Sequence, residues 1–550
     1  MAVVTGDNSG VTWAVNGVAG GNSTLGTIDQ TGNFTAPSAT QSSKAAITAT
    51  SKGDTSSSAS ATALIVAPAT VAATPNPQVA LLTISPPDDS NVSVQFGTDT
   101  NYGLSTWTQP ATETSGPVSL FVAGMRANTL YHMRAVIQFS DGTQFMDADR
   151  VFTTGALPPN QLPALTATTT PGMTPQSGVE LLAMTVPFGS TALGVVVSDL
   201  SGNVLWSYNP GLPSGVVAAN PVKLLPNGHF LIVFSGTPPD GVDSVLQEVD
   251  LSGKLIWQMD AAALNAALAS ATCAGCNITV IGAHHDFQFL PNGHLIVIAA
   301  LQQVISGVTV TGDAIIDLDQ NHNPVWVWNE FDHLDTNRRP YMFPDWTHTN
   351  AVIYSADDGN LIISMRHQNW LVKIDYANGA GAGDILWHLG YQGDFALQGV
   401  TDPTDPSNWF YAQHGPSFVT SNTTGKFSLV LFDNGDDRVF ASGVTCGAAG
   451  QPPCLYSTVP LLELDETAKT ATVAFNPTTP VYSFFGGNAE TLKNGNVEYD
   501  ESATNITPPS AAIYEVTQTS PPQTVWQMQI AGQFAYRGMR LPSLYPGVQW

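Results

Sequence analysis

Four short segments between residues 284 and 414 concentrate histidines around one arginine. They are His284-His285-Asp286, Asp345-Trp346-Thr347-His348-Thr349-Asn350, Met365-Arg366-His367-Gln368 and Gln413-His414-Gly415. The whole chain has only 11 histidines and 17 Lys and Arg residues. Imidazole titrates near neutrality, and a guanidinium group pairs bidentately with oxyanions such as sulfate or phosphate. These segments therefore predict a site that handles an anionic group.

Zinc binding is the alternative chemistry for three histidines, because a His₃ set is a known catalytic zinc site. Arg366 argues against it, since a fixed cation beside a divalent ion costs Coulomb energy. We therefore predict neither a metal nor a cofactor. Asp286 and Asp345 are candidate partners that orient the imidazoles. Tyr536 and Arg537, near the last strand, are weaker candidates for the same site.

A repeat from about residue 165 onward predicts the elements that position these residues. Each unit has a strand, a tight Asn-Gly-type turn, two more strands and an edge strand that carries tryptophan. The units run over 225–257, 290–328 and 357–387, with degenerate copies over 424–465 and 493–526 and an opening unit that ends at Trp206. About six four-stranded units indicate an all-β domain, a six-bladed β-propeller over 157–550 with a linker at 157–170. Leu181–Met184 and Arg540–Tyr545 are predicted to close one blade together.

The repeat also predicts that the histidines meet. Counted back from the turn glycines Gly293, Gly359 and Gly425, the offsets are eight residues for His285 and eleven for both His348 and His414. The first strand of a propeller blade lines the central channel, so the three side chains are expected at one mouth of it. Arg366 ends the second strand of one of these blades and returns to the same face, with Asn350 and His367 close by. His229 and His294 follow Asn-Gly turns and are expected to be hydrogen-bonded turn residues.

These motifs carry a family resemblance. The segment from Asp345 to Asn350, then Asp357-Asp358 with Leu361-Ile362-Ile363-Ser364-Met365-Arg366-His367-Gln368, and Gln413-His414, resembles the bacterial arylsulfate sulfotransferases over most of 165–550. The resemblance implies an exported six-bladed propeller behind an N-terminal β-sandwich. It also implies an enzyme that moves a sulfuryl group from a phenolic sulfate ester to a phenol acceptor, without a nucleotide sulfate donor.

The resemblance further implies roles for individual residues. Such enzymes form a transient sulfohistidine in a ping-pong reaction, and by position in the motif that residue is His414. His285, His348 and Arg366 resemble the residues that hold the sulfate oxygens, with His284 as the alternative to its neighbour. Asn350, His367 and Tyr536 complete the predicted substrate-binding set. Two features depart from the family pattern: there are two N-terminal modules, and a helix with a cysteine pair is inserted before His285.

Two other readings of the repeat remain open at the level of sequence. The run from Asp250 to Trp257 resembles a quinoprotein propeller repeat, which would make the chain a pyrroloquinoline quinone dehydrogenase. Too few blades and no evident calcium-site constellation stand against that reading. The non-enzyme alternative is an adhesin or carbohydrate-binding propeller on Ig-like stalks, with vestigial histidines.

The N-terminal third predicts two small β-sandwiches. Residues 1–66 alternate with period two between Gly, Asn and Ser turns and resemble a bacterial Ig-like domain. Residues 67–156 resemble a fibronectin type III domain through the segment from Leu130 to Val136. These modules are predicted to be spacers or dimerisation surfaces, so a homodimer is one expected assembly. A loop from one of them over the substrate site is a less favoured expectation.

Composition narrows the partners and the compartment. A formal net charge of −26 and a pI near 4.4 argue against nucleic acid and anionic membrane surfaces as partners. No apolar run approaches the roughly 20 residues of a membrane span. No signal peptide is visible, and we expect that a leader was removed.

The cysteines and one helix complete the predictions. The four cysteines form two local pairs, Cys273 with Cys276 and Cys446 with Cys454, which favours structural disulfides over redox or zinc chemistry and so a periplasmic or secreted protein. A helix is predicted over 261–269, with Asp260 as its N-cap. It should be an insertion on the face where the first strands of the units begin.

Overall fold

The computed structural model describes residues 9–38, 41–158, 161–185, 194–209, 218–236 and 244–550. Their regular secondary structure is almost wholly antiparallel β-sheet, so the predicted all-β class is confirmed. No helix among them is long and apolar enough to cross a membrane. The chain divides into two compact units, 1–157 together with Trp550 and 158–549. Within the predicted linker, Pro159 and Asn160 lie outside the described residues.

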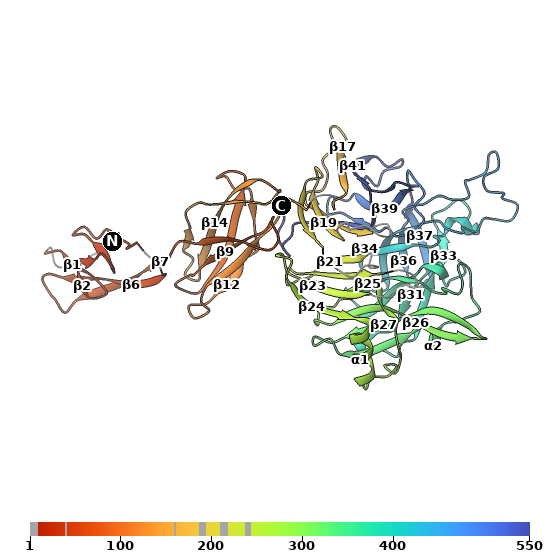
Figure 1. Ribbon diagram of the computed structural model, residues 1–550, viewed down its shortest axis with the longest axis horizontal. Helices are drawn as coiled ribbons and strands as arrows, with labels where there is room; N and C mark the ends of the chain where they lie inside the picture. The colour runs from red at the N-terminus through yellow and green to blue at the C-terminus, as the bar shows by residue number, and fades with distance from the viewer. Residues whose placement is uncertain (1–8, 39–40, 159–160, 186–193, 210–217, 237–243) are drawn as a thin grey trace. The chain divides into compact units, whose positions relative to one another are not determined.

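The first unit contains two pairs of sheets, each around its own core (Figure 1). The first pair consists of the sheets β2-β1-β6-β7 and β3-β4-β5. Its strands are β1 (Val11–Val15), β2 (Val18–Ala19), β3 (Gly21–Asn22), β4 (Gly26–Ile28), β5 (Phe34–Thr35), β6 (Ser43–Ser51) and β7 (Ser58–Ile65). Alternate residues of these strands, such as Val15, Ile28 and Ala45, point inward and form the core.

The second pair consists of the sheet β11-β10-β14-β15, extended by β12 and β16, and the sheet β13-β9-β8. Its strands are β8 (Thr70–Ala73), β9 (Ala80–Ile84), β10 (Ser90–Gly97), β11 (Leu104–Ser105), β12 (Gln109–Ala111), β13 (Val118–Val122), β14 (Leu130–Phe139), β15 (Gln144–Met146) and β16 (Arg150–Thr153). Trp550 packs edge-on to Phe96 of this core, and its indole nitrogen donates to the carbonyl oxygen of Ser105 at 2.9 Å.

The second unit contains six four-stranded antiparallel groups within the described residues (Figure 1). Three of them are consecutive in the chain: β21–β24, β25–β28 and β29–β32. Their strands are β21 (Ala218–Leu224), β22 (Phe230–Ser235), β23 (Val245–Val249), β24 (Leu255–Asp260), β25 (Gly282–Phe289), β26 (Leu295–Ile305), β27 (Val308–Leu318), β28 (Pro324–Asn329), β29 (Thr349–Ser355), β30 (Asn360–Met365), β31 (Trp370–Ile374) and β32 (Ile385–Leu389). The second strands β22, β26 and β30 contain nearly continuous apolar runs, because both faces of these sheets are buried there.

The other groups are β34–β37, with β33 added in parallel to β37, and β38–β41, with β17 added beside β41. The last group joins β18–β20 to β42 from the other end of the chain. The strands are β17 (Ala164–Thr169), β18 (Val179–Thr185), β19 (Val195–Asp199), β20 (Val204–Tyr208), β33 (Ala396–Gln398), β34 (His414–Thr423), β35 (Lys426–Phe432), β36 (Leu461–Asp465), β37 (Thr470–Phe475), β38 (Ala489–Thr491), β39 (Val497–Ile506), β40 (Pro509–Val516), β41 (Thr524–Ala531) and β42 (Phe534–Leu541).

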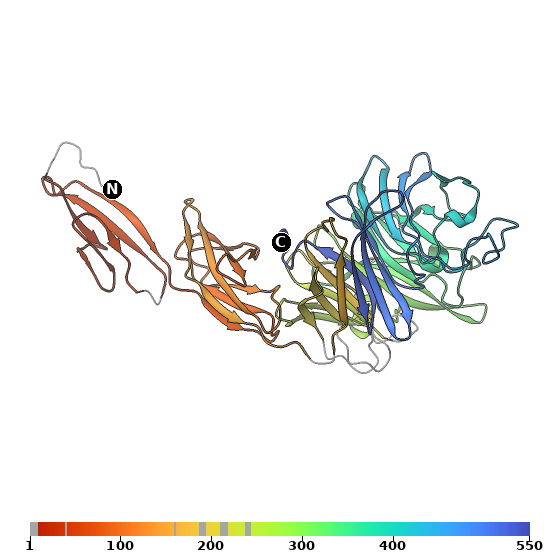
Figure 2. The same ribbon diagram turned by 90° about the horizontal axis from the view of Figure 1, so that it is seen from above.

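The two ends of this unit pair with each other, but the C-terminal strand is β42 (Phe534–Leu541) rather than the predicted Arg540–Tyr545. Leu181 lies opposite Met539, and β42 runs antiparallel to β18 along its length. Figure 2 shows the blue strands beside the yellow-brown ones of β17–β20. Part of the predicted linker is not a linker, because β17 pairs with β41. Its threonine-rich alternating sequence suits the edge of a sheet.

The first strands of the groups lie next to one another in sequence order. β21 contacts β25, β25 contacts β29, β29 contacts β34 and β34 contacts β38, while β42 contacts both β39 and β21. These contacts therefore form a closed ring, which begins and ends at β21. Residues at the beginning of different first strands are brought close together in this way.

The helical segments are short. They are α1 (Ala261–Ser270), α2 (Glu330–His333), η1 (Arg366–Gln368), η2 (Ala377–Gly379) and η3 (Pro406–Asn408). The predicted helix and its cap are confirmed, since Asp260 accepts a hydrogen bond from the backbone N–H of Ala263 at 2.8 Å. Helix α1 lies between β24 and β25 and buries Leu264 and Leu268.

Candidate active site

The three predicted histidines lie at the beginnings of three neighbouring first strands. His285 is in β25, His348 immediately precedes β29, and His414 is the first residue of β34. The shorter offset of His285 from its turn glycine has a structural reason. Strand β25 begins three residues before His285, so this histidine lies inside its strand, whereas the other two lie at the edge of theirs.

The backbone is irregular at each of these positions. His285 and His348 have φ angles of 58° and 51°, and Ala412, two residues before His414, has 52°. The pairing of each first strand with its neighbour also shifts register there. Positive φ is costly for residues other than glycine and is retained mainly at functional sites. Such bulges turn side chains away from the regular alternation of a strand.

Because of the bulge in β25, the consecutive side chains of His284, His285 and Asp286 point in three different directions. The His284 Nε2 atom lies 2.7 Å from Asp313 Oδ1. The Asp286 carboxylate binds Lys223 at 2.6 Å and Arg537 at 3.2 Å. Only His285 points toward the other predicted histidines. The expectation that Asp286 orients an imidazole is wrong, because a lysine and a buried arginine hold this carboxylate.

The predicted residues form one buried cluster of rings. The centroid of the His285 ring lies 4.7 Å from that of His348, and the His348 ring lies 4.5 Å from that of His367. Tyr536, from β42, lies 5.7 Å from the His285 ring and 6.2 Å from the His414 ring. The first strands β25, β29 and β34 therefore meet β42 at this cluster.

The tautomer of His414 is fixed by its surroundings. Asn434 Nδ2 donates to the carbonyl oxygens of Ser483 at 2.8 Å and Gly486 at 3.1 Å, so the Asn434 oxygen must face His414. That oxygen lies 2.7 Å from His414 Nδ1 and can only accept, which makes Nδ1 the protonated nitrogen. The lone pair of His414 is therefore on Nε2, which faces the backbone N–H of Gly486 at 3.3 Å.

His414 is held in its neutral form. Burial first, and then the positive charge of Arg366, keeps the pKa of His414 well below its usual range, although the Asn434 hydrogen bond acts in the opposite direction. The pKa of His285 is also well below its usual range, because of burial and the nearby His284, His348 and His414. Both imidazoles are thus uncharged at neutral pH, which a nitrogen nucleophile requires.

Arg366 is held from several sides but keeps one donor. Its Nη2 donates to Asp436 Oδ2 at 2.9 Å and to the carbonyl oxygen of Phe484 at 3.0 Å, and its Nη1 donates to His367 Nε2 at 2.8 Å. Its Nε is buried and has no hydrogen-bond partner among the described residues. The Nε of Arg537 is likewise buried and has no hydrogen-bond partner among the described residues. Buried donors without partners are rare in proteins, and two of them suit an anion.

Asn350 joins two of the neighbouring strands. Its Nδ2 donates to the carbonyl oxygen of Gln413, directly before His414, at 2.7 Å. The backbone carbonyl oxygen of Asn350 accepts from Arg537 Nη2 at 2.9 Å. Its side-chain oxygen is buried and meets no donor within the described part of the chain. The predicted residue therefore lies between the nucleophile candidate and the second arginine.

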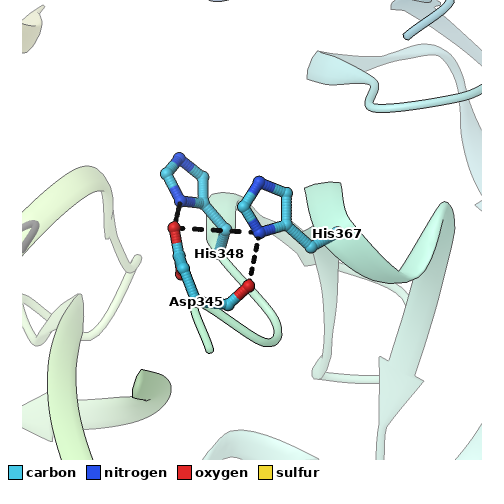
Figure 3. A group of neighbouring side chains, drawn as sticks. All are labelled: Asp345, His348 and His367. Atoms are coloured by element: carbon cyan, nitrogen blue, oxygen red, sulfur yellow. Dashed lines mark hydrogen bonds and ion pairs between the residues drawn. The ribbon is translucent and has the colours of Figure 1, made fainter. Parts of the chain in front are cut away.

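Asp345, His348 and His367 form a compact group (Figure 3). Their candidate ligand atoms all lie within 4.8 Å of one another. His348 Nδ1 lies 2.7 Å from Asp345 Oδ2, and His367 Nδ1 donates to the Asp345 carbonyl oxygen at 2.8 Å. His367 Nε2 accepts from Arg366, so neither of its nitrogens is free to bind an ion. A fixed guanidinium beside the group also disfavours a metal.

The charges in this group are clearly assigned. Burial alone would raise the pKa of Asp345, but His348 outweighs it and the pKa lies below its usual range, so this carboxylate is charged. Burial first, and then His348, lowers the pKa of His367 to about 2, so this imidazole is neutral. Asp345 Oδ2 accepts a hydrogen bond from His348 Nδ1–H, so Nε2 is the nitrogen of His348 that can exchange a proton with another group. Of the two predicted orienting carboxylates, Asp345 does contact an imidazole.

Sequence reasoning missed the residues that hold the predicted ones. They are Asn434 and Asp436 after β35, Asp313 in β27, and Tyr341, whose ring lies 5.0 Å from that of His367. One signal was present: Asn434 follows the second strand of its group just as Arg366 follows β30. The repeat could therefore have identified both positions together.

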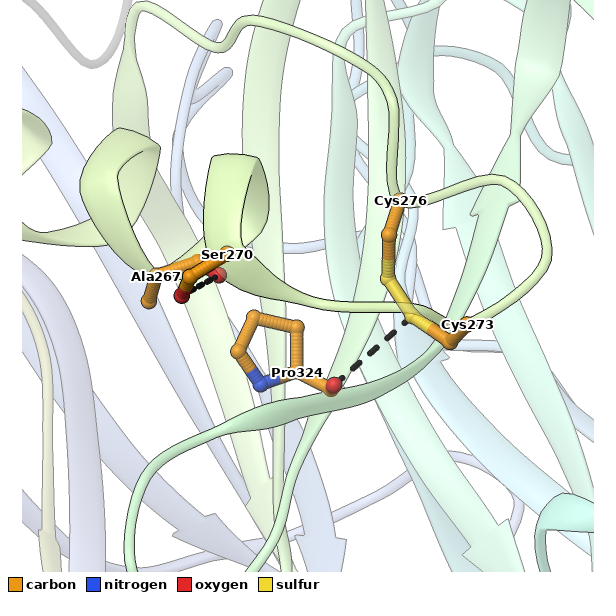
Figure 4. The surroundings of a disulfide bond; sticks show 5 residues. All are labelled: Ala267, Ser270, Cys273, Cys276 and Pro324. Carbon is orange, nitrogen blue, oxygen red and sulfur yellow. Dashed lines mark hydrogen bonds between the residues drawn. A yellow bond between two sulfur atoms is a disulfide. The ribbon is translucent and has the colours of Figure 1, made fainter.

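The cysteines pair as predicted. Cys273 and Cys276 have Cα atoms 5.4 Å apart, and Cys446 and Cys454 have Cα atoms 4.9 Å apart. The first bond follows α1, and Cys273 Sγ lies 3.7 Å from the carbonyl oxygen of Pro324 in β28 (Figure 4). Neither pair contributes to the group of Asp345, His348 and His367, which contains no cysteine.

The profile of the family described as arylsulfotransferase (ASST) matches residues 174–537. The chain belongs to the arylsulfotransferase family. The matched range contains every residue of the ring cluster and ends at Arg537, so the predicted family is confirmed. Family membership indicates a sulfotransferase with small-molecule substrates.

Other comparisons add little to the arylsulfotransferase assignment. No curated protein matches the chain. Among solved structures, a candidate 6-phosphogluconolactonase from Bacteroides uniformis is 10% identical, with a TM-score of 0.33 and coverage of 82% of this chain and 100% of that one. A likeness this low carries no argument.

Proposed function

We propose that this arylsulfotransferase moves a sulfuryl group from a phenolic sulfate ester to a phenol, in two steps through a sulfohistidine at His414. The observation that carries the proposal is the fixed tautomer of His414. Asn434 holds the proton on Nδ1, so the neutral imidazole has its lone pair on Nε2. A histidine nucleophile must have a ring nitrogen that is not protonated.

The first step forms an N–S bond and breaks an S–O bond. His414 Nε2 attacks the sulfur of the donor ester, and the phenolate leaves with the electron pair of the S–O bond. The leaving oxygen then takes up a proton. In the second step, the oxygen of an acceptor phenol gives up its proton and attacks the same sulfur. The N–S bond breaks, and its electron pair returns to Nε2.

The arginines are proposed to hold the sulfuryl oxygens. Arg366 and Arg537 both lower the pKa of His414 through their charge, after burial as the largest cause, which places both cations near its ring. Each has a buried Nε–H without a partner among the described residues. Such fixed donors stabilise charge that develops on the transferred group, because they need no reorganisation during the reaction.

His285 and His348 are proposed to transfer the protons. Asp345 binds Nδ1 of His348, which leaves Nε2 as the nitrogen that exchanges a proton with the substrate. His285 lies between His348 and Tyr536 and is held neutral. Neutral imidazoles can take a proton from the acceptor phenol and return one to the leaving oxygen. No metal and no cofactor is needed for these steps.

The finer predictions about architecture are part of the same proposal. We infer that the six four-stranded groups form a six-bladed propeller behind Ig-like (1–66) and fibronectin type III-like (67–156) sandwiches. The closed order of first-strand contacts supports the propeller, and the two two-sheet cores support the sandwiches. Two cysteine pairs at disulfide distance suit a periplasmic or secreted enzyme, and we keep the homodimer as a proposed assembly.

The test is to isolate the intermediate. The protein is mixed with p-nitrophenyl sulfate without an acceptor, quenched at alkaline pH and digested. We expect the peptide that contains His414 to gain the mass of one sulfuryl group, and to lose it when phenol is added before quenching. Turnover without any modified peptide would contradict the covalent route. Modification of another histidine would overturn the assignment of His414.

A further inference from the structure

The proposed steps leave a buried pair of residues unused. His284 is 1% exposed and Asp313 is 2% exposed. His284 contacts Asp313 through Nε2, at 2.7 Å, and the Nδ1 atom of His285 through its own Nδ1. The three side chains therefore form one chain of contacts, from a buried carboxylate to a histidine of the ring cluster.

The hydrogen bonds determine the positions of some of the protons on Asp313 and His284. Asp313 Oδ2 accepts from Thr347 Oγ1 at 3.1 Å and from the backbone N–H of Thr349 at 2.6 Å. Its Oδ1 faces His284 Nε2, and a carboxylate that accepts from an Nε2–H satisfies all three contacts at once. His284 must then carry a proton on Nε2. One further proton lies between the two Nδ1 atoms.

We propose that Asp313 and His284 form a proton relay that switches His285 between an acid and a base. The relay deepens the proposed sulfuryl transfer and rests on it. When His284 holds both protons, its Nδ1–H donates to His285, and His285 carries its own proton on Nε2. When the Nε2 proton of His285 leaves and the shared proton moves to His285 Nδ1, His285 Nε2 has the lone pair.

The relay balances both half-reactions. As the phenolate leaves, it takes the Nε2 proton of His285, while the His284 Nδ1 proton passes to His285 Nδ1, and His284 becomes neutral. When the acceptor phenol attacks, its proton goes to His285 Nε2. The His285 Nδ1 proton then returns to His284, which becomes an imidazolium again. One proton enters and one leaves in each cycle.

Charge explains why the proton is stored on His284. His285 is buried, has Arg366 among its neighbours and faces the ring of Tyr536, so a positive charge on it would be disfavoured by desolvation and by the guanidinium. His284 faces the carboxylate of Asp313 directly and that of Asp345 at longer range.

A second acid lies behind Asp313 but does not compete for the imidazolium. Glu330 of α2 accepts from the backbone N–H of Asp313 at 2.9 Å. Burial first, and then the charge of Asp313, raises the pKa of Glu330 well above its usual range. Glu330 is therefore neutral, and Asp313 remains the counter-ion of His284.

The relay predicts a dependence on the leaving group. Phenyl sulfate needs its leaving oxygen protonated, whereas p-nitrophenyl sulfate releases a stable phenolate. In His284→Phe, we expect the sulfation of His414 by phenyl sulfate to slow by about 100-fold, the lower end of general acid catalysis, and that by p-nitrophenyl sulfate to slow less than about fivefold. Asp313→Asn should show the same split. Rates are measured in single-turnover mixing with a series of substituted phenyl sulfates.

A matched control lies at the other end of the same sheet. His294 pairs with Asp317 at 3.0 Å, outside the ring cluster. His294→Phe should leave both donors unaffected. If His284→Phe slows all donors equally, then His284 is only structural and the relay is overturned.

A second measurement does not depend on turnover. Nitrogen NMR of the wild-type protein, labelled in histidine, reports which ring nitrogens carry protons. We expect His284 to hold protons on both nitrogens in the resting protein at neutral pH. A resting His284 with a bare Nδ1 overturns the relay even if the enzyme is active. A doubly protonated His284 in a protein that transfers no sulfuryl group supports the relay's resting state while the proposed function fails.

Discussion

Histidine–carboxylate pairs occur at both ends of the same sheets, but only one end forms a cluster. At the turn end, His229 binds Glu248 at 2.6 Å and His294 binds Asp317 at 3.0 Å, as expected for turn residues. At the end where the first strands begin, His348 binds Asp345 at 2.7 Å. The pair itself is thus a common device for satisfying a polar ring and does not identify a site.

The two ends differ in what lies beyond the pair. The side chains of His229 and His294 are 28% and 25% exposed, and each has a single carboxylate partner. At the strand-start end, rings from β25, β29, β34 and β42 meet, and two arginines add positive charge. Burial and these neighbours keep the imidazoles neutral, which turns them into bases and nucleophiles. The reactive residues are therefore found where several strands meet, and the histidines at the turn end have only a structural role.

The largest expected effect is the loss of the nucleophile. In His414→Ala, kcat for transfer from p-nitrophenyl sulfate to phenol should fall by about 10⁴-fold or more, as when a covalent nucleophile is removed from other enzymes. Release of p-nitrophenol measures it. An activity close to wild type would show that His414 is not the nucleophile.

Arg366→Lys is expected to come next. Lysine keeps the charge but lacks the planar fork and the Nε donor, so kcat/KM should fall by about 10²- to 10³-fold. Arg339→Lys is the control, because this exposed guanidinium stacks on Phe343 at 3.9 Å. If both substitutions have the same small effect, the charge of Arg366 matters and its geometry does not.

Asn434→Asp tests whether His414 must be neutral. A carboxylate at this position favours the imidazolium, so the pKa of His414 should rise from well below its usual range toward neutrality. The protonated ring has no lone pair, and activity should therefore be lost as the pH falls. We expect about a tenfold loss at pH 6 for each pKa unit by which the new value exceeds that pH. Superimposable pH profiles of wild type and variant would contradict the tautomer assignment.

The smallest effects belong to the turn end. His229→Gln and His294→Gln should change kcat by less than about twofold, as expected for partly exposed positions away from a site. Both are measured in the same p-nitrophenol assay. A large loss in either variant would mean that the two ends are not functionally distinct.

The sequence predicts the meeting of the histidines but not their orientation. The offsets from the turn glycines place His285, His348 and His414 at equivalent strand beginnings, because a repeat preserves position. They cannot show which of His284 and His285 points inward, since the positive φ of His285 decides it. Asn434 and Asp436 were missed because no residue type alone reveals a partner distant in sequence.

Other predictions differ in how far local sequence determines them. The N-cap at Asp260 follows from a local pattern and is confirmed, whereas the pairing of the two ends follows from the closure of the repeat, which did not give the bounds of β42. The role expected for Asp286 failed because Lys223 and Arg537 come from strands whose side-chain directions the repeat does not encode.

The position of β42 has a consequence for biosynthesis. Tyr536 and Arg537 lie on this strand, so they leave the ribosome after every other residue of the cluster. Until they arrive, Asp286 lacks one of its cations and β18 lacks its partner strand. A chain that stops before residue 534 can contain His414, Arg366 and all the sheets from β18 to β41 and still have no complete reaction centre. Catalytic competence therefore requires that β42 has been synthesised and has paired with β18.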